Sequence, residues 1–530
     1  MSKAENNLRM EWKNNGPVPG EMESDVNWQE IPWKKLERHV FKLQKRIYKA
    51  SQRGDVKTVH KLQKLLIKSW SARCIAVKGV FPQNQGAKSF SPEQKLVLAR
   101  QLSVIAKSLL VRKNLSLVVF TIYNQALTLL ISMAMSPEWD AKFNLGLHEG
   151  NSDISCYNAI KSIHREVVKK PKYVLAGELE ESFQGVNSEY FLKELNTFPL
   201  LGKQIKLWLK LGVLNHQQLL FPRERTTICS LSSLLLGVAL GELQRRIDGI
   251  LIGLMADSNQ PKTTAFNSNV INVIPHFVKH QGGFVLVHQE LAVIISCERI
   301  ITQWLSEVGL KLKAEGLKIS HSLYDYQGNV GCNFLGFYIR QFVRQRNSHG
   351  QPLTDGSNYN TLITVSQQSL KEHTKSLGAI IDQHRSAKQS VLISKLNPLI
   401  ERWTKYYSPL ISDRIFSKVD FELHSKLRAW SRRRHNQKGK RWISKRYWSI
   451  TKGEGWRFGH QNSEGKTYEL MKHQHIHQDL KLRRSGSTSI ENIHPQVKAV
   501  KNGMLGRQDK SHPIEEPCEL KNSCTVLKTS

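Results

Sequence analysis

The sequence predicts an α+β protein with helical blocks towards both ends and a mixed middle. Apolar residues repeat with helical spacing near the N-terminus and again after residue 366. Between these blocks, helical stretches alternate with short runs rich in β-branched and aromatic residues, at 172–175, 284–287 and 334–339. The length of 530 residues allows about two to four domains, and an apolar fraction of 40% excludes wholesale disorder.

The first helical block covers residues 27–90, after a polar stretch at 1–26 that we expect to be a disordered tail. Its first apolar residues recur every three or four positions, at Leu36, Val40, Leu43 and Ile47. Gly54 and Asp55 interrupt this spacing, which then resumes at Val59, Leu62, Leu66 and Trp70. The pattern therefore predicts two helices joined by a turn.

The middle block, residues 91–345, combines helices with the short β-rich runs. Within it, residues 115–135 carry no charge over a length that would span a bilayer. Six Ser, Thr, Asn and Gln side chains lie in the same stretch, and hydrocarbon penalises such groups. We therefore expect a buried helix of a large domain and no membrane partner.

The last third of the chain divides into three segments. Residues 346–365 are polar and rich in Ser, Asn and Gly, which indicates a linker. Residues 366–460 return to helical spacing and form a second helical block. Residues 461–530 are basic and polar without clear periodicity, so little core is expected there.

The charge of the chain points to a polyanionic partner. Lys and Arg number 78 against 44 Asp and Glu, a formal net charge of +34, which argues against an enzyme of cationic substrates. Seven scattered Cys do not suggest a disulfide framework, so we expect a reduced intracellular compartment. The first 30 residues hold three basic and six acidic side chains and no apolar core, which fits neither a signal nor a transit peptide.

Two basic segments are candidates for nucleic-acid contact. Residues 33–73 contain 13 basic and 2 acidic side chains, and residues 425–450 contain ten basic and none that is acidic. Aromatic residues are interleaved with the second segment at Trp430, Trp442, Tyr447 and Trp448. Lys and Arg neutralise phosphates, and exposed rings stack on unpaired bases. The alternatives are ordinary solvated helices whose rings pack a core, or a membrane surface, which would need an apolar face.

Several collinear runs resemble the group II intron-encoded reverse transcriptase/maturase family. The family's N-terminal extension is similar to WKKLERHVFKLQKRIYKASQRGD at 33–55. Its polymerase blocks are similar to MSPEWDAKF at 135–143, LKELNTFPLLGKQIKLWLKLGVL at 192–214 and NFLGFYIRQF at 333–342. Its maturase domain X is similar to LNPLIERWTKYYSPLISDRIFSKVDFELHSKLRAWSRRRH at 396–435.

The resemblance implies a right-hand polymerase-like fold. Residues 27–90 would be the helical N-terminal extension, 91–345 degenerate fingers and palm, and 366–460 the helical thumb, domain X. Members of the family bind their own intron RNA and promote its splicing. Many also reverse transcribe, and some carry a C-terminal HNH endonuclease.

The positions that would hold catalytic carboxylates have changed. Two-metal phosphoryl transfer needs carboxylates that converge on two Mg²⁺ ions. The resemblance places one metal-binding Asp at Glu178 and the Tyr-Ala-Asp-Asp turn at residues 280–283, His-Gln-Gly-Gly, so two carboxylates are replaced by Gly282 and Gly283. Two further polymerase blocks are altered at 147–160 and 226–229. We therefore expect no catalytic residue and no cofactor, with Mg²⁺ relevant only to residual polymerase activity.

The C-terminal region gives no sign of an intact HNH endonuclease. Its Cys518 and Cys524 have no second pair, whereas the family version usually carries paired zinc ligands. His473, His475 and His477 alternate, and on a strand they would share one face that could bind a metal. The resemblance instead makes this segment the continuation of domain X, so no metal site is expected.

The leading hypothesis is an RNA-binding maturase that has lost polymerase activity and helps its intron RNA to fold and splice. The expected RNA contacts on the N-terminal hairpin are Arg38, Lys42, Lys45, Arg46 and Lys49. Those on the thumb are Lys405, Tyr406, Arg428, Arg432, Arg433, Arg434, Lys440, Arg441, Lys445 and Arg446, with Tyr406 and Trp403 open to a core role instead.

Two other hypotheses stay open. One is an active RNA-directed DNA polymerase of a mobile intron that uses displaced carboxylates such as Glu178 and Glu290. The other is a decayed, non-functional intron reading frame. Intron RNA is the expected partner, with a DNA target and a homodimer left open, and both a bacterial cytoplasm and a plastid stroma fit the sequence.

Overall fold

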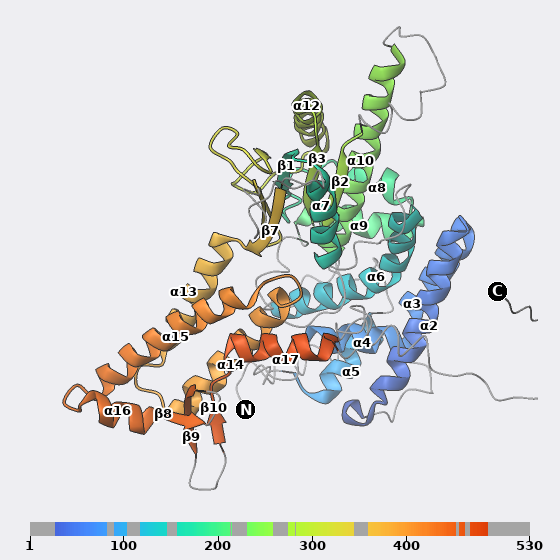
Figure 1. Cartoon of the computed structure of the whole chain (residues 1–530). Helices are drawn as coiled ribbons and strands as arrows, with labels where there is room; N and C mark the ends of the chain where they lie inside the picture. Colours follow the sequence, from blue (N-terminus) through green and yellow to red (C-terminus); the bar gives the residue numbers. More distant parts are fainter. Residues whose placement is uncertain are drawn as a thin grey trace, which may run out of the picture.

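The computed structural model confirms a mixed helix and strand chain, with helices at both ends and sheets between them (Figure 1). The parts of the chain that it describes are residues 27–81, 90–102, 117–145, 156–212, 214, 231–257, 274–280, 282–343, 359–451, 455–461 and 467–485. The expected tail at 1–26, the altered block at 226–229 and most of that at 147–160 lie outside them.

The N-terminal block is helical, with the short 3-10 helix η1 at Trp28–Glu30 before α2 at Trp33–Gln52 and α3 at Val56–Lys68. The predicted hairpin is confirmed, and its apolar residues are buried on one face of α2. Asp55 begins α3 by accepting a hydrogen bond from the backbone N–H of Thr58, at 3.0 Å. The expected continuation to Trp70 is wrong, because a break at Ser69 starts a separate helix. The helices that follow are α4 (Trp70–Val80) and α5 (Pro92–Gln101).

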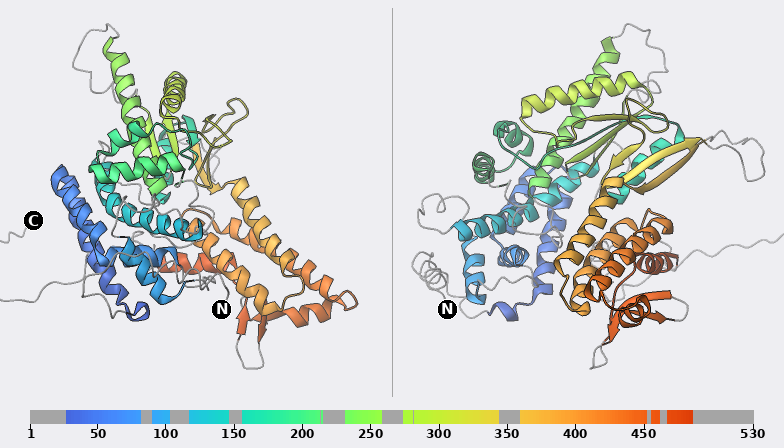
Figure 2. Two further views of the ribbon diagram at one scale, coloured as in Figure 1. Left: turned by 180° about the vertical axis from the view of Figure 1, so that it is seen from behind. Right: turned by 90° about the vertical axis from the view of Figure 1, so that its left-hand side faces the viewer.

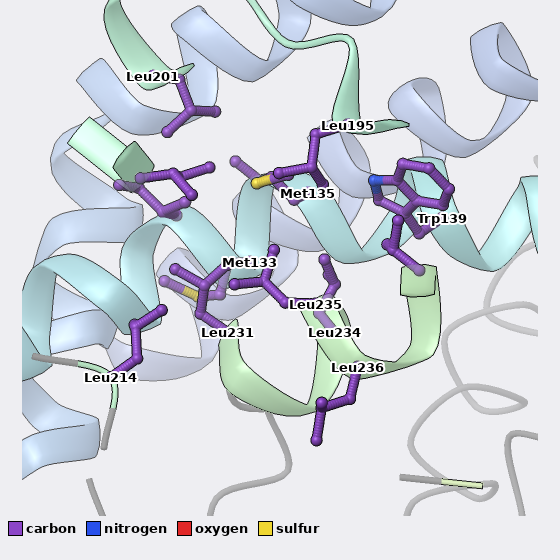
Figure 3. Packing of buried hydrophobic residues seen from close by; sticks show 14 of the residues in the cluster. Met133, Met135, Trp139, Leu195, Leu201, Leu214, Leu231, Leu234, Leu235 and Leu236 are labelled. Carbon is purple, nitrogen blue, oxygen red and sulfur yellow. The ribbon is translucent and has the colours of Figure 1, made fainter. Parts of the chain in front are cut away.

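The uncharged stretch forms α6, Leu117–Leu145, which packs against α2 and α4 of the N-terminal block and against α10, Leu231–Asp257. Figure 3 shows Met133 of α6 close to Leu231 of α10, and Met135 close to Leu195. The polar residue Asn124 is satisfied inside the protein, because its Oδ1 accepts the indole N–H of Trp208 at 3.1 Å. None of the helices in the described residues combines the length and apolarity needed to cross a membrane.

The central sheet has four antiparallel strands in the order β2-β3-β1-β4. Two hairpin-linked strands and two helical crossovers give the β-α-β-β-α-β topology of ferredoxin-like sheets. The strands are β1 (Tyr173–Glu178), β2 (His276–His280), β3 (Gly283–His288) and β4 (Lys318–His321). The other helices of this region are α7 (Cys156–Lys169), α8 (Ser188–Leu195), α9 (Pro199–Leu211) and α12 (Leu291–Val308).

Both faces of the central sheet are covered. Leu175 and Leu286 lie opposite each other and face the core that α10 and α12 also build. Val174 and Val287, one residue along, face a second core shared with α7 and the C-terminal half. This two-sided burial explains why β3 reads as a continuous apolar run rather than an alternating one.

A second sheet joins the central region to the helices that follow residue 366. Its strands are β5 (Cys332–Phe334), β6 (Phe337–Val343) and β7 (Tyr359–Val365). The expected linker at 346–365 is therefore wrong over its last seven residues, which pair along the whole of β6. Their side chains alternate between half-buried and exposed, as in a strand with one solvent-exposed face.

The thumb, which we define as residues 366–485, is drawn in orange and red in Figure 1 and lies below the central sheet in both views of Figure 2. Its helices are α13 (Gln367–Gln383), α14 (Gln389–Tyr407), α15 (Asp413–Arg434), α16 (Lys440–Tyr447) and α17 (His473–Ser485). Its strands are β8 (Trp448–Thr451), β9 (Gly455–Gln461) and β10 (Thr467–Glu469). The predicted helical block thus ends at residue 447, and α17 contributes buried side chains where little core was expected.

Candidate nucleic-acid interface

The two predicted catalytic positions of the palm lie side by side. Glu178 ends β1 and is paired with Gly283 at the start of β3. The backbone N–H of Leu179 donates to the carbonyl oxygen of Gly282, at 2.9 Å. The sheet therefore brings together the sites that the sequence comparison aligned with catalytic carboxylates, although only Glu178 carries one.

The residues at this hairpin do not fit a pair of Mg²⁺ ions. The turn at 280–283 carries no second carboxylate, and that of Glu178 forms an exposed ion pair with Lys313. In the described part of the chain, no group of three or more His, Cys, Asp or Glu side chains could hold a metal. Glu290 follows β3 at the opposite end of the sheet, beyond the pair Tyr173–His288, so it does not approach Glu178.

Apolar side chains also close the hairpin. Gly282 is buried with φ +89°, and a Cβ atom there would lie 2.9 Å from Cδ1 of Leu236. A Cβ atom at Gly283 would lie 3.0 Å from Cε2 of Phe334. Both contacts are closer than side chains normally make. The turn that would present carboxylates to a substrate is thus packed beneath leucine and phenylalanine.

The N-terminal hairpin presents a continuous basic surface on α2. All five predicted contacts are exposed, while the opposite face of the helix is buried against α4 and α6. Within the described residues, none of the five forms an ion pair with an acidic side chain. Sequence reasoning left out Lys34 and Lys35, which are exposed at the start of the same helix and extend the surface.

The predicted thumb cations fall into two groups. Arg428, Arg432, Lys440, Arg441, Lys445 and Arg446 are exposed on α15 and α16. The others have protein partners: Lys405 pairs with Glu401 one turn earlier, and Arg433 lies 3.5 Å from Asp382. Arg434 is half-buried, because its Nη1 donates to the carbonyl oxygens of Arg385 and Ala387 at 3.0 and 2.8 Å.

The aromatic residues of the basic segment mostly build the thumb core. Trp430, Tyr447 and Trp448 are buried and pack with Phe458 of β9, and the Trp430 indole N–H donates to a backbone carbonyl. Trp442 is the exception, with 42% of its surface exposed. It is therefore the ring of this segment that is placed to stack on a base.

Tyr406, named among the RNA contacts, is placed where the thumb meets the sheet of β5, β6 and β7. Its hydroxyl donates to the carbonyl oxygen of Leu335 at 2.9 Å, and its ring packs near Phe337. Its own carbonyl accepts the hydroxyl of Tyr157 from α7, at 3.0 Å. Trp403 likewise packs against buried residues. The helical spacing of α14 is the signal that favours this core role.

The three alternating histidines do not share one face, because they lie on helix α17 rather than on a strand. His473 and His477, one turn apart, are both buried against α14 and α15. Nδ1 of His473 lies 2.6 Å from Asp420, and Nε2 of His477 lies 2.6 Å from Asp413. Each thus meets a separate carboxylate of α15, and this anchoring of α17 was not foreseen.

Comparisons with known proteins agree with this division of the chain. The family model described as the N-terminal domain of reverse transcriptase matches residues 28–106, and that of the group II intron, maturase-specific domain matches residues 370–448. A protein named maturase-like protein 1, from Euglena gracilis, is 27% identical over 246 residues. The match covers 41% of this chain and 52% of that protein, so the chain spans about half the length of this relative.

Proposed function

This chain belongs to the group II intron-encoded reverse transcriptase/maturase family, and from that premise we propose that it binds a structured intron RNA and promotes its splicing. One observation carries the proposal. The region matched by the maturase-specific domain, 370–448, is also the region whose exposed Arg and Lys side chains gather on α15 and α16. A second basic surface, on α2, lies in the other matched domain.

The proposed mechanism is electrostatic binding to the folded RNA. Exposed Lys and Arg side chains neutralise phosphates and release their counterions, so affinity falls as salt rises. A protein that binds the native RNA fold and not the unfolded one stabilises it by mass action. The RNA itself supplies the splicing chemistry, and the protein supplies positive charge on two surfaces of one chain.

We also propose that the protein does not polymerise DNA. Metal-assisted phosphoryl transfer requires a group of carboxylates. The hairpin at Gly282 carries none and is closed by apolar side chains, and the carboxylate of Glu178 is paired with Lys313. Both observations support the proposal. A DNA target belongs to the mobile, polymerising members of the family, so the proposal does not include one. It needs no second copy either, because one chain carries both basic surfaces.

The proposal is compatible with a bacterial cytoplasm or a plastid stroma. Both are reducing, and disulfides are rare in such compartments. None of the four Cys that the structure describes, Cys74, Cys156, Cys297 and Cys332, forms a disulfide.

The test uses the full chain and the intron RNA transcribed from around its reading frame. Binding is measured over a range of salt concentrations, and splicing is followed with and without protein. Variant K42Q/K45Q should weaken binding and lower the salt slope by about 1.4 to 1.8, at about 0.7 to 0.9 per phosphate contact. Control variant K203Q/K210Q removes the same charge from exposed positions on α9 and should leave the slope unchanged.

Three results would contradict the proposal. A salt-independent affinity would exclude the basic surfaces as the interface. Splicing that proceeds equally well without the protein would instead favour a decayed reading frame. DNA synthesis in a primer-extension assay would favour the active polymerase.

A further inference from the structure

A small hollow lies on the thumb between the C-terminal half of α15 and the whole of α16. Its wall is formed by Arg428, Ser431, Arg432, Lys440, Ile443, Ser444 and Trp448. Arg428 and Arg432 are one helical turn apart and so project on the same side of α15. Lys440 closes the third side, from the first turn of α16. Three cations from two helices thus surround one opening.

These three cations lack the neutralising contacts that their neighbours have. In the described parts of the chain, neither Arg428, Arg432 nor Lys440 forms an ion pair or a side-chain hydrogen bond. Arg433 and Arg434, next in the sequence, are held by Asp382 and by backbone carbonyls. Three like charges around one opening repel one another unless an anion lies between them. The arrangement therefore favours an anionic ligand.

A second, independent observation comes from Trp448, which lines the same hollow. The residue is only 7% exposed, and its indole Nε1 is buried without a hydrogen-bond partner among the described residues. Buried N–H groups are nearly always paired, because an unpaired one loses its hydration without gaining a partner. An indole N–H only donates, so the missing partner is an acceptor such as an anionic oxygen.

We propose that this hollow binds a single phosphate group of the RNA backbone. Arg side chains match the geometry of phosphate oxygens, and the Ser444 hydroxyl in the wall adds a further donor. The side chains of the wall offer positive charge and hydrogen-bond donors, so the hollow recognises phosphate rather than sequence. RNA as the source of that phosphate rests on the function proposed above, whereas the affinity for phosphate itself does not.

The experiment compares two triple variants of the full chain. R428Q/R432Q/K440Q removes the cations of the hollow. K371Q/K375Q/K395Q removes three exposed cations of the same thumb that do not line it. Thermal unfolding is measured with inorganic phosphate and with chloride at matched ionic strength, and binding of the intron RNA is measured alongside. We expect phosphate to raise the unfolding midpoint of the wild type and the control, but not of the hollow variant.

For RNA, we expect the hollow variant to lose at least tenfold more affinity than the control variant. W448F removes the indole N–H together with part of the buried ring, so its unfolding midpoint in chloride is first compared with that of the wild type. Phosphate should then raise this midpoint less than it raises that of the wild type. Equal behaviour of the two triple variants would overturn the proposal. If the wild type binds intron RNA but phosphate does not raise its unfolding midpoint, the phosphate site is overturned and the proposed function stands. If phosphate raises the midpoint but the protein does not bind intron RNA, RNA is overturned as the source of the phosphate.

Discussion

Nε2 of His373 on α13 lies 2.9 Å from Nε2 of His473 on α17. The two rings meet nearly at right angles, and His373 is stacked on Trp403 with ring centroids 4.4 Å apart. Nδ1 of His473 lies 2.6 Å from Asp420. A single proton can lie between the two Nε2 atoms, so the contact requires at least one of these rings to stay neutral.

Acid should therefore weaken the thumb. Burial, then the neighbouring His473 and Arg402, lower the pKa of His373 from 6.5 to about 3. The unfolded state takes up this proton first, so the contribution is complete above pH 6.5 and decreases as the pH falls towards 3. Between pH 6.5 and 5 the loss should reach about 2 kcal/mol of unfolding free energy, at about 1.4 kcal/mol per pH unit. Thermal unfolding over this range measures it.

The control for this prediction is H373Q, which cannot titrate. Its stability should vary less between pH 6.5 and 5 than that of the wild type. An equally steep curve would assign the pH dependence to other histidines whose pKa is lowered by burial, which are His164, His321, His424 and His475.

Asp420 should be the strongest single anchor of α17. Its carboxylate accepts the backbone N–H groups of His473 and Gln474, both at 2.9 Å, and so caps the helix from a neighbouring one. Replacing Asp420 with Ala removes this cap and leaves Nδ1 of His473 without its carboxylate partner, which should lower the unfolding free energy by about 2–4 kcal/mol. Urea unfolding and trypsin cleavage within α17 measure the effect.

Asp382 provides the matched control for that variant. It is a more exposed carboxylate of the same thumb, 3.5 Å from Arg433, and surface pairs of this kind contribute little. D382A should therefore unfold like the wild type and keep α17 protected. Equal protection of α17 in D420A would show that packing alone holds the helix.

The sequence predicted elements that carry a local signal. The α2–α3 hairpin follows from helical periodicity, and α6 and β3 follow from uncharged and apolar runs; the structure confirms all three. The strand β7 was missed because the polar segment before it dominated the composition. Its partner β6 lies in a separate run, and no local signal carries that pairing.

The sequence predicted which segments carry the basic surfaces, but not which of their side chains are free to contact a ligand. Counting cations found the exposed faces of α2 and α15, because a surplus of one sign needs no knowledge of packing. It could not separate Arg432, at the hollow, from Arg434, which is bound to backbone carbonyls 49 and 47 residues earlier in the chain. Nor could it find Asp420 beside His473, which lies 53 residues away.

Tyr406 should act in the fold and not in RNA binding. Its hydroxyl is half-buried and donates to the Leu335 carbonyl, which joins α14 to the β5–β6 turn. Y406F keeps the ring and removes that hydrogen bond, so we expect about 0.5–1.5 kcal/mol less unfolding free energy and unchanged affinity for the intron RNA. Chemical unfolding and RNA titration at one salt concentration test both halves. A several-fold loss of affinity without loss of stability would return Tyr406 to the interface.

Restoring acidic residues to the palm hairpin should not restore polymerisation. In the double variant G282D/G283D, the new side chains would meet Leu236 and Phe334, and residue 282 would keep a positive φ that non-glycine residues seldom adopt. Crowding and strain together should cost about 2–4 kcal/mol of unfolding free energy. Primer extension with Mg²⁺ and with Mn²⁺ should stay at background for both the variant and the wild type.

Gly185 separates strain from crowding in that experiment. It also has a positive φ, +80°, but no atom lies within 4 Å of the position of its Cβ. G185D should therefore lose only the smaller, conformational part of the stability, about 1–2 kcal/mol. If G282D/G283D were no less stable than G185D, the hairpin would open more readily than its packing implies. DNA synthesis by G282D/G283D would then show that polymerisation is absent from the wild type because two carboxylates are missing, and not because apolar side chains cover the hairpin.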